Sequence, residues 1–301
     1  MQYKRLICCS VGHVAGLFVG AVCYADDVLL IAPSRNAMQR MLFELEKFAE
    51  ESNVEFSTNP IPEKSKTKCI FMSGCKRNLS KPAPLILCGR QLPFVRQADH
   101  LGNMLTEAGD MDHDTEIKNA KFIRSAVEIR QTFKAAAPSE QVKSLKVYSS
   151  SFYGSNLWDL GGCKAKKVYS SWNTSVKLAW GLPQQTRTYF LQQLLYCGFS
   201  SARVDILSRF VTFFHGLLAS ASYEVQVLSR LFARDRKSVT GKNLALIREL
   251  TGLNPWSASL GSIRSALISQ EKVEVPPTDI WRLPYLVSLL SQRNHAHFMA
   301  A

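Results

Sequence analysis

Short apolar runs separated by turn residues fill the first hundred positions, a pattern typical of strands rather than of long helices. The clearest run spans residues 22–31 and reads Val-Cys-Tyr-Ala-Asp-Asp-Val-Leu-Leu-Ile. Two adjacent aspartates, Asp26 and Asp27, stand between two apolar halves. We interpret this segment as a tight β-hairpin with buried half-strands and with both carboxylates at its tip.

Adjacent carboxylates in an apolar setting repel each other and lose hydration, so they are rarely kept without a cation or proton to share. A hairpin tip of this kind can hold two divalent metal ions for phosphoryl transfer. The alternative is a turn with two solvated acids, because Asp is a common turn residue. The apolar residues on both sides of Asp26 and Asp27, and the Tyr-Ala pair before them, favour the metal-binding interpretation.

Apolar residues at helical spacing follow the hairpin. Ser34 is suited to cap a helix over residues 35–52, whose apolar positions recur three and four apart. The strand pattern then returns and ends in a hairpin around Leu101 and Gly102. The strands expected after the helix are at 54–57, 69–72, 85–88 and 91–95.

From Thr115 onward the pattern predicts helices almost throughout. The first of these helices has an apolar stripe and a basic stripe: Ile117, Ala120, Ile123 and Val127 form the first, and Lys118, Lys121 and Arg124 form the second. Further helices are expected at about 138–152, 172–180, from Thr186, and at 203–219, 223–233, 242–251, 263–269 and 284–297.

Three acids at alternate positions, Asp110, Asp112 and Asp114, precede that first helix. They could suggest a metal site, but no Gly or Glu follows at the spacing of a Ca²⁺ loop. Acids at the start of a helix interact favourably with its dipole. We therefore interpret them as a helix start.

The strand-rich beginning and the helical remainder together predict an α+β protein. We expect three domains, at 1–108, 109–200 and 201–301.

Charge points to a polyanionic partner. The 301 residues include 37 basic and 24 acidic side chains, which gives a formal net charge of +13. Nucleic acid is the simplest partner for such a chain, although the charge also suits a membrane surface. The eight cysteines form no Cys-x-x-Cys pair and no zinc-binding spacing, which favours a reduced, intracellular protein.

The amino terminus has an alternative interpretation. Lys4 and Arg5, followed by the apolar run 6–25, resemble a signal peptide. Glycines interrupt that run, and the expected cleavage point would fall inside the Tyr-Ala-Asp-Asp segment. The run does not predict a transmembrane helix, because Asp26 and Asp27 break it.

Three segments together resemble the second half of the palm of a non-LTR (LINE-type) retrotransposon reverse transcriptase. Residues 24–27, Tyr-Ala-Asp-Asp, match the metal-binding motif of that family. Asn59 with Lys-Ser-Lys at 64–66 resembles its next motif. Leu101-Gly102 resembles the primer-grip hairpin, although His100 stands where the family usually has Tyr.

The resemblance implies roles for these residues. Asp26 would bind one or both Mg²⁺ ions beside the primer 3′ end, and Asp27 would support the metal site. The ions would activate the 3′-hydroxyl and stabilise the developing charge. Lys64 would lie near the leaving pyrophosphate, with Lys66 as its rival because the Lys-Ser-Lys repeat leaves the register open.

The resemblance also implies nucleic-acid contacts, with an RNA template and a DNA primer as partners. In the palm these contacts would come from Tyr24, Leu101 and Gly102. The helical region from residue 109 would be a thumb, in which Lys118, Lys121 and Arg124 face phosphates, with a helical extension from 201.

The family requires another aspartate on a strand upstream of the Tyr-Ala-Asp-Asp motif, and residues 1–25 contain no Asp or Glu. We therefore expect a fragment of the parent enzyme that cannot polymerise alone. The alternative is a non-enzymatic basic helical protein, either nucleic-acid-binding or, if the amino terminus is cleaved, secreted. We expect the polymerase-derived chain in the cytoplasm or nucleus and not in a membrane, and nothing in the sequence indicates its oligomeric state.

Overall fold

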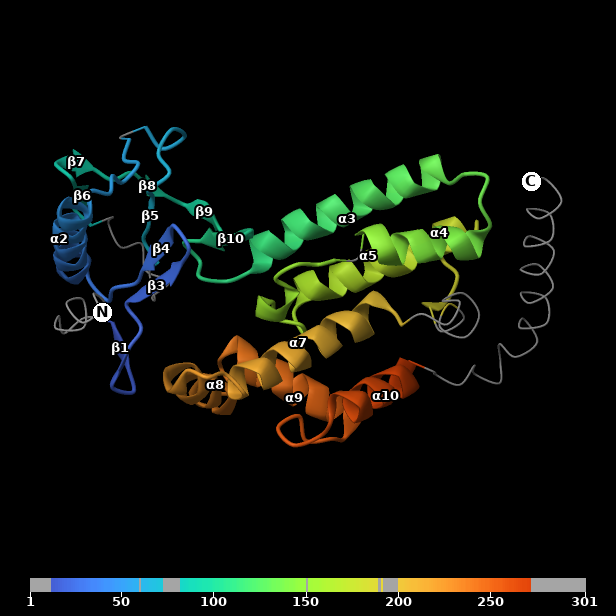
Figure 1. Ribbon diagram of the computed structural model, residues 1–301. Coiled ribbons are helices and arrows are strands. Elements are labelled where there is room, and N and C mark those ends of the chain that lie inside the picture. Colours follow the sequence, from blue (N-terminus) through green and yellow to red (C-terminus); the bar gives the residue numbers. More distant parts are fainter. Residues whose placement is uncertain are drawn as a thin grey trace. The chain divides into compact units, whose positions relative to one another are not determined.

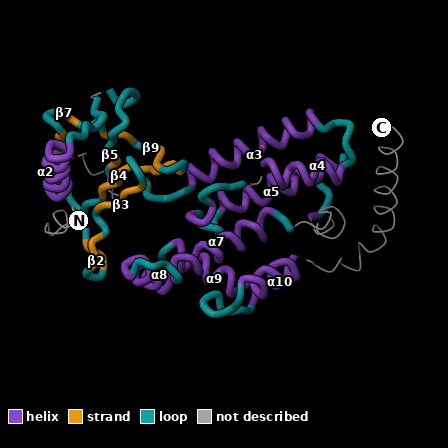
Figure 2. The backbone as a smooth tube through the Cα atoms, in the orientation of Figure 1, coloured by secondary structure: helices purple, strands orange, loops and turns teal. Residues whose placement is uncertain are grey.

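A computed structural model of the chain describes residues 12–59, 61–72, 82–149, 151–188, 191 and 200–271. The chain forms two compact units, Met1–Asp110 and Met111–Ala301. All the described strands belong to unit 1, and the described part of unit 2 is helical (Figures 1 and 2). The structure therefore confirms the α+β class.

The strands of unit 1 form two-stranded ladders rather than one sheet. Four ladders are antiparallel hairpins: β1 (His13–Val14) with β2 (Leu17–Phe18), β3 (Ala21–Tyr24) with β4 (Asp27–Leu30), β6 (Ile86–Leu87) with β7 (Arg90–Gln91), and β9 (Gln97–His100) with β10 (Asn103–Thr106). The fifth ladder, β5 (Cys69–Ile70) with β8 (Phe94–Val95), is parallel, which the sequence pattern did not predict.

The strand expected at 54–57 does not form. Asn53 ends the preceding helix with a left-handed φ of 53°, and the Val54 N–H donates to Ala49 O at 2.9 Å. Ser57 O instead accepts a hydrogen bond from Thr67 N, which closes a loop. Local bonds thus use backbone groups that a ladder would need.

Helix α2 (Arg35–Ser52) begins as the sequence predicts. The Ser34 hydroxyl accepts a hydrogen bond from Ala37 N at 3.2 Å, which satisfies one of the free amides of the first turn. The buried face includes Leu42, which packs against Leu87 and its neighbours. The Gln39 side-chain amide donates to Ile86 O at 2.8 Å and accepts from Ile86 N at 2.9 Å. It thus satisfies both backbone groups of this residue of β6.

Unit 2 is built around a single hydrophobic core. Its elements are α3 (Asp112–Thr132), α4 (Pro138–Ser144), the π-helical turn η1 (Leu145–Ser149), the 3₁₀ turn η2 (Ser155–Leu157), α5 (Cys163–Ala179), α7 (Ala202–Leu218), α8 (Tyr223–Arg234), α9 (Val239–Thr251) and α10 (Leu260–Glu271). The largest fully buried side chains include Trp158, Trp172, Phe210 and Phe214. Residues on both sides of position 200 belong to this one core. The helix predicted at 284–297 and most of the one predicted from Thr186 lie outside the described residues.

The buried face of α3 differs from the predicted apolar stripe. Phe122, Ala126 and Ile129 are buried, whereas Ile123 and Val127 are 45% and 49% exposed. Aromatic packing explains which face of α3 is buried. The ring centroid of Phe122 lies 6.0 Å from that of Trp172 and 5.4 Å from that of Phe152. Burying an aromatic ring removes more apolar surface from water than burying an aliphatic side chain.

Asp114 confirms the predicted helix start and has a structural role as well. It lies in the first turn of α3 and is only 2% exposed. One carboxylate oxygen accepts from Trp158 Nε1 at 2.9 Å and from Lys118 Nζ at 2.8 Å. This buried pair ties the start of α3 to the loop before α5. From α9, the fully buried Asn243 side chain reaches the same loop, where it donates to Trp158 O at 2.8 Å and accepts from Leu160 N at 2.9 Å.

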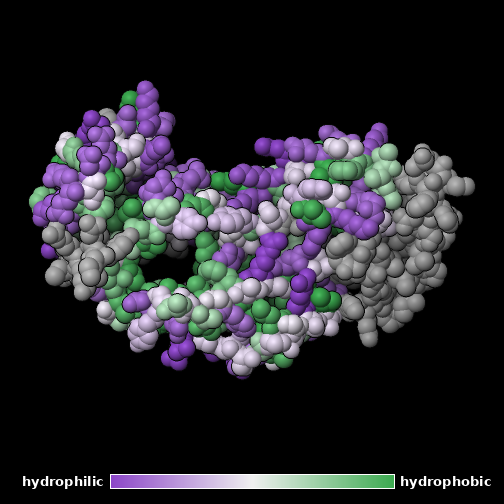
Figure 3. Space-filling view, in the orientation of Figure 1, coloured by the Kyte–Doolittle hydropathy of each residue, from purple (hydrophilic) through white to green (hydrophobic). Residues whose placement is uncertain are grey.

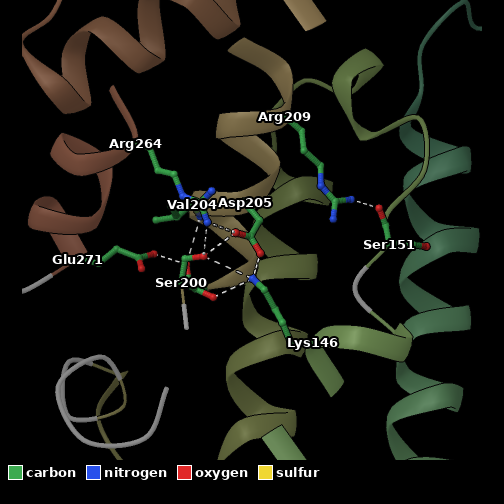
Figure 4. Close-up of polar contacts among 9 residues, drawn as sticks. Lys146, Ser151, Ser200, Val204, Asp205, Arg209, Arg264 and Glu271 are labelled. Carbon is green, nitrogen blue, oxygen red and sulfur yellow. Dashed lines mark hydrogen bonds and ion pairs between the residues drawn. The ribbon is translucent and has the colours of Figure 1, made fainter. Parts of the chain in front are cut away.

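A second polar network joins segments of unit 2 that are distant in the sequence. Figure 4 shows Lys146 of η1 pointing toward Asp205 of α7, with which it forms an ion pair, and toward Ser200. The Lys146 ammonium donates to Ser200 O at 3.0 Å. At the end of α10, the Glu271 carboxylate accepts a hydrogen bond from the Ser201 hydroxyl. The network therefore fastens η1 and α10 to the start of α7.

Burial perturbs the ionisable groups of this network. It lowers the pKa of Lys146 to about 8, and the guanidinium groups of Arg209 and Arg264 act in the same direction. The Glu271 carboxylate opposes that shift. Burial also raises the pKa of Glu271 above its ordinary value. Both groups thus pay a desolvation cost for their charge, which their hydrogen bonds offset in part.

None of the described helices is long and apolar enough to cross a membrane.

We predict that Asp114→Asn lowers the free energy of unfolding of unit 2 by about 3 kcal/mol, because it leaves the Lys118 ammonium without its buried counter-ion. Asp112→Asn is the matched control, since it removes the same charge from the same turn at an exposed position. Its cost should stay below about 1 kcal/mol. Urea unfolding of the whole chain, followed by far-UV circular dichroism, measures both. Equal losses for the two variants would contradict the structural role of Asp114.

Candidate functional site

The Tyr-Ala-Asp-Asp segment forms the predicted hairpin. The β3–β4 register pairs Tyr24 with Asp27 and Ala21 with Leu30. Ala25 and Asp26 are therefore the two residues of the turn, and Asp27 opens β4. The pairing brings Tyr24, Asp26 and Asp27 together at one end of the ladder.

The expected burial of the half-strands is wrong. Tyr24 is 69% exposed, Val22 51% and Val28 40%, and both aspartates are exposed. Figure 3 shows apolar residues at the surface of unit 1 in the region of β3 and β4. The physical reason is that β3 and β4 pair only with each other among the described strands.

Among the described residues, packing contacts cover the base of the hairpin. Leu30 and Ala21 pack against Ala37 and Met41 of α2. Beyond this contact the ladder projects into solvent, so the two carboxylates keep their hydration. An apolar ladder with free edges is a surface on which another strand can pair.

The turn at the tip is strained. Ala25 has a φ of 52°, in the left-handed region that costs a residue with a Cβ about 1–2 kcal/mol. The other three hairpin turns also begin with a positive φ, at Ala15, Cys88 and Leu101, but in each of them a glycine follows, itself at positive φ. The Tyr-Ala-Asp-Asp turn has Asp26 at that second position instead. Of the hairpin turns in the described part of the chain, this is the one that lacks glycine, and it carries a carboxylate instead.

Asp26 and Asp27 are the residues of the hairpin that could hold a metal ion. Carboxylate oxygens are the ligands that Mg²⁺ prefers, and Mg²⁺ is commonly bound through one or two carboxylates together with substrate phosphates. Within the described ranges, no group of three or more His, Cys, Asp or Glu side chains is placed to hold a metal. The donor set therefore fits a substrate-dependent Mg²⁺ ion and falls short of a closed metal site.

The lysine loop is held by its own hydrogen bonds. The Ser65 side chain, in a residue only 3% exposed, donates to Thr67 O at 2.6 Å and accepts from Asn59 N at 3.3 Å. Asn59 Oδ1 in turn accepts from Ile61 N at 2.9 Å. These bonds leave Lys64 and Lys66, on either side of Ser65, exposed.

Both lysines of this loop are available to an anionic ligand. No hydrogen bond or ion pair joins either of them to Asp26 or Asp27 in the described part of the chain. Because Lys64 and Lys66 are alike in exposure, both remain candidates for the pyrophosphate-side role.

The Leu101-Gly102 hairpin also forms, with His100 opposite Asn103. Leu101 is 37% exposed and has a φ of 49°, and Gly102 has a φ of 73°. The Leu101 side chain is therefore presented at the tip of a tight turn.

In unit 2, the three residues of the predicted basic stripe on α3 differ in their surroundings. The Lys118 ammonium is paired with the buried Asp114 carboxylate and lies 5.7 Å from the Tyr153 ring centroid. Lys121 and Arg124 are exposed. Of the stripe, these two present their charge to solvent, whereas Lys118 stabilises the fold.

The sequence pattern did not single out a basic hollow around Trp256 in unit 2, although Arg234, Arg236, Lys242 and Arg248 precede that tryptophan at short intervals. The signal that could have found it is the clustering of cations around an aromatic residue.

We predict that Ala25→Gly strengthens the hairpin by up to about 1 kcal/mol, because glycine removes the strain of the positive φ. Ala21→Gly, in a regular strand of the same ladder, should weaken it by about 0.5–1 kcal/mol. Amide hydrogen exchange of the β3–β4 ladder measures both effects. A loss of protection in Ala25→Gly similar to that in Ala21→Gly would contradict the strained turn.

No protein-family model matches the chain, and no curated protein matches it.

Proposed function

We propose that this chain derives from an RNA-directed DNA polymerase of the non-LTR (LINE-type) retrotransposon group. In this proposal unit 1 corresponds to the second half of the palm, and the helices of unit 2 correspond to the thumb and a helical extension. The chain would bind an RNA template and a DNA primer, inside the cell, without completing the polymerase site.

The observation that carries the proposal is the geometry of the hairpin tip. Asp26 lies in a two-residue turn whose first residue, Ala25, has a positive φ, and Asp27 opens the returning strand. A turn built only for stability would favour glycine here, as in the other three hairpins. Holding exposed carboxylates on a strained turn is typical of a site selected for binding rather than for stability.

The residues of unit 1 would divide the work of binding as follows. Asp26 and Asp27 would hold Mg²⁺, which when bound activates a hydroxyl nucleophile and stabilises the charge that develops on phosphate. The exposed Tyr24 ring and the Leu101-Gly102 turn would contact the primer strand. Lys64 or Lys66 would neutralise the leaving pyrophosphate from a loop that is already ordered by Ser65.

Two carboxylates do not complete a two-metal site. Residues 1–25 contain no Asp or Glu, so a third carboxylate for such a site would have to come from elsewhere. The free edges of β3 and β4 are where such a strand would pair. We therefore propose that the chain alone does not polymerise.

The second candidate is a non-enzymatic basic helical protein that binds nucleic acid or, if its amino terminus is removed, is secreted. The size of the unit 2 core favours it, because the described residues of that core all belong to unit 2 and none belongs to the hairpin. Intact-mass measurement of the protein from its native source separates the secreted form, since that form would lack residues 1–25.

Primer extension with the purified chain tests the polymerase proposal. We predict no Mg²⁺-dependent extension of an RNA-templated DNA primer, and no difference between the wild type and Asp26→Asn. Extension that depends on both Mg²⁺ and Asp26 would overturn the incomplete site.

The genomic sequence immediately upstream gives an independent test of ancestry. We expect it to encode, in some reading frame, a strand that carries an aspartate and can pair with β3 or β4. Upstream sequence with no such strand in any frame would contradict the polymerase proposal and favour the non-enzymatic alternative.

A further inference from the structure

A basic hollow of about 880 Å³ opens on unit 2, between α8, α9 and the segment that leads into α10. Its lining combines four cationic side chains with one aromatic ring. These residues are Arg234, Arg236, Lys242, Arg248 and Trp256. Among the described residues that line it, Glu249 is the one acid.

Three of these cations have no partner within the described chain. Arg234, Arg236 and Arg248 are exposed, and no hydrogen bond or ion pair joins their guanidinium groups to another described residue. Lys242 is half-exposed, and its ammonium lies 3.6 Å from Asp159 Oδ2. The hollow therefore presents positive charge that the fold itself does not neutralise.

Trp256 is held in a defined position at this hollow. Its ring meets that of Phe214 edge-on, with a centroid distance of 5.2 Å and an interplanar angle of 89°. His215 Nε2 lies 2.8 Å from Pro255 O, and the Asn254 side chain accepts from Trp256 N at 3.2 Å. Trp256 is nevertheless 37% exposed. One ring contact and two hydrogen bonds of the adjoining backbone thus hold this residue, while part of its surface faces solvent.

A fixed aromatic ring with unpaired guanidinium groups around it matches the chemistry of single-stranded nucleic acid. Bases that are not paired expose their faces and stack on aromatic side chains, whereas phosphates bind Arg and Lys. A duplex keeps its bases stacked inside, so it would use the charges but not the indole. We propose that this hollow binds single-stranded nucleic acid, with Trp256 stacking on a base and with Arg234, Arg236 and Arg248 contacting phosphates.

This site is separate from the Tyr-Ala-Asp-Asp hairpin and needs no metal ion. It does not rest on the polymerase proposal, because a non-enzymatic helical protein could carry the same hollow. It assigns to the last hundred residues a binding role that their sequence pattern did not reveal.

Fluorescence anisotropy of the full chain with a labelled, mixed-sequence 20-nucleotide DNA strand, in EDTA, tests the stacking residue. We predict that Trp256→Leu weakens binding by about 5- to 150-fold, the range expected for one base-stacking contact. Phe213→Leu is the matched control, since Phe213 is 38% exposed and does not line the hollow. It should change the affinity by less than about 2-fold.

The salt dependence of binding tests the guanidinium groups. Because these side chains are exposed, their substitution also keeps the proposal testable if the Trp256 variant fails to fold. Substituting Arg234, Arg236 and Arg248 together by Ala should reduce the slope of log affinity against log salt by about 2, since each phosphate contact contributes about 0.7 for a single strand. The charge-matched control substitutes Arg40, Lys47 and Lys143, which are exposed and do not line the hollow. It should leave the slope within about 0.5 of the wild type.

Three results would overturn the proposal. The first is wild-type affinity in Trp256→Leu. The second is an equal loss of salt slope in the two triple variants. The third is a poly-glutamate peptide that competes as well as the DNA strand and is as sensitive to Trp256→Leu, which would make the hollow an acidic-peptide site. Because the assay contains EDTA and its variants lie in the hollow, its outcome does not depend on a metal ion at the hairpin, so failure here is distinguishable from failure of the polymerase proposal.

Discussion

Among the described strands, β3 and β4 pair only with each other, and this limited pairing is the constraint that shapes unit 1. A two-stranded ladder in water is marginal unless a third strand or a packed face supports it. In this chain α2 covers the base of the hairpin through Ala37 and Met41, while the tip remains in solvent. The same openness keeps the two carboxylates hydrated and leaves their apolar flanks without cover. Incomplete pairing among the described strands thus accounts for the exposure of both the carboxylates and their apolar flanks.

In unit 2 the constraint is burial rather than exposure. Its core is continuous, so the polar groups that the core surrounds need hydrogen-bond partners. Asp114 and Asn243 do this at the loop around Trp158, and the Lys146–Asp205 pair does it at the start of α7. Removing one partner from such a network leaves a buried donor or charge without compensation, which is why these positions are more sensitive than their polarity suggests.

Local signals predicted the parts of the fold that depend on neighbouring residues. The helix after Ser34, the Tyr-Ala-Asp-Asp hairpin and the Leu101-Gly102 hairpin all follow from capping and turn chemistry within a few positions. The buried face of α3 could not be predicted in this way, because Phe122 and Ile123 lie on two overlapping apolar stripes. Only the rings of Phe152 and Trp172, supplied by distant segments, select between them.

The same difference between local and distant signals applies to the candidate sites. Asp26 and Asp27 could be identified as candidates because their motif is continuous in sequence. Their exposure could not be predicted, since it depends on which strands pair with β3 and β4. The hollow around Trp256 was missed because its cations come from α8, α9 and the turn between them, while the ring contacts Phe214 of α7. Proximity of that kind is a property of helix packing and leaves little trace in a linear pattern.

We propose that Asp26 and Asp27 are ligands of an incomplete metal site. Titration of the chain with Mn²⁺, a spectroscopic substitute for Mg²⁺, followed by electron paramagnetic resonance, tests it most directly. We predict a weak, saturable Mn²⁺ site that is lost in the variant with both Asp26→Asn and Asp27→Asn. The control variant with both Asp110→Asn and Asp112→Asn should retain this site. Saturable binding that survives in the hairpin variant, or no saturable binding in the wild type, would contradict the claim.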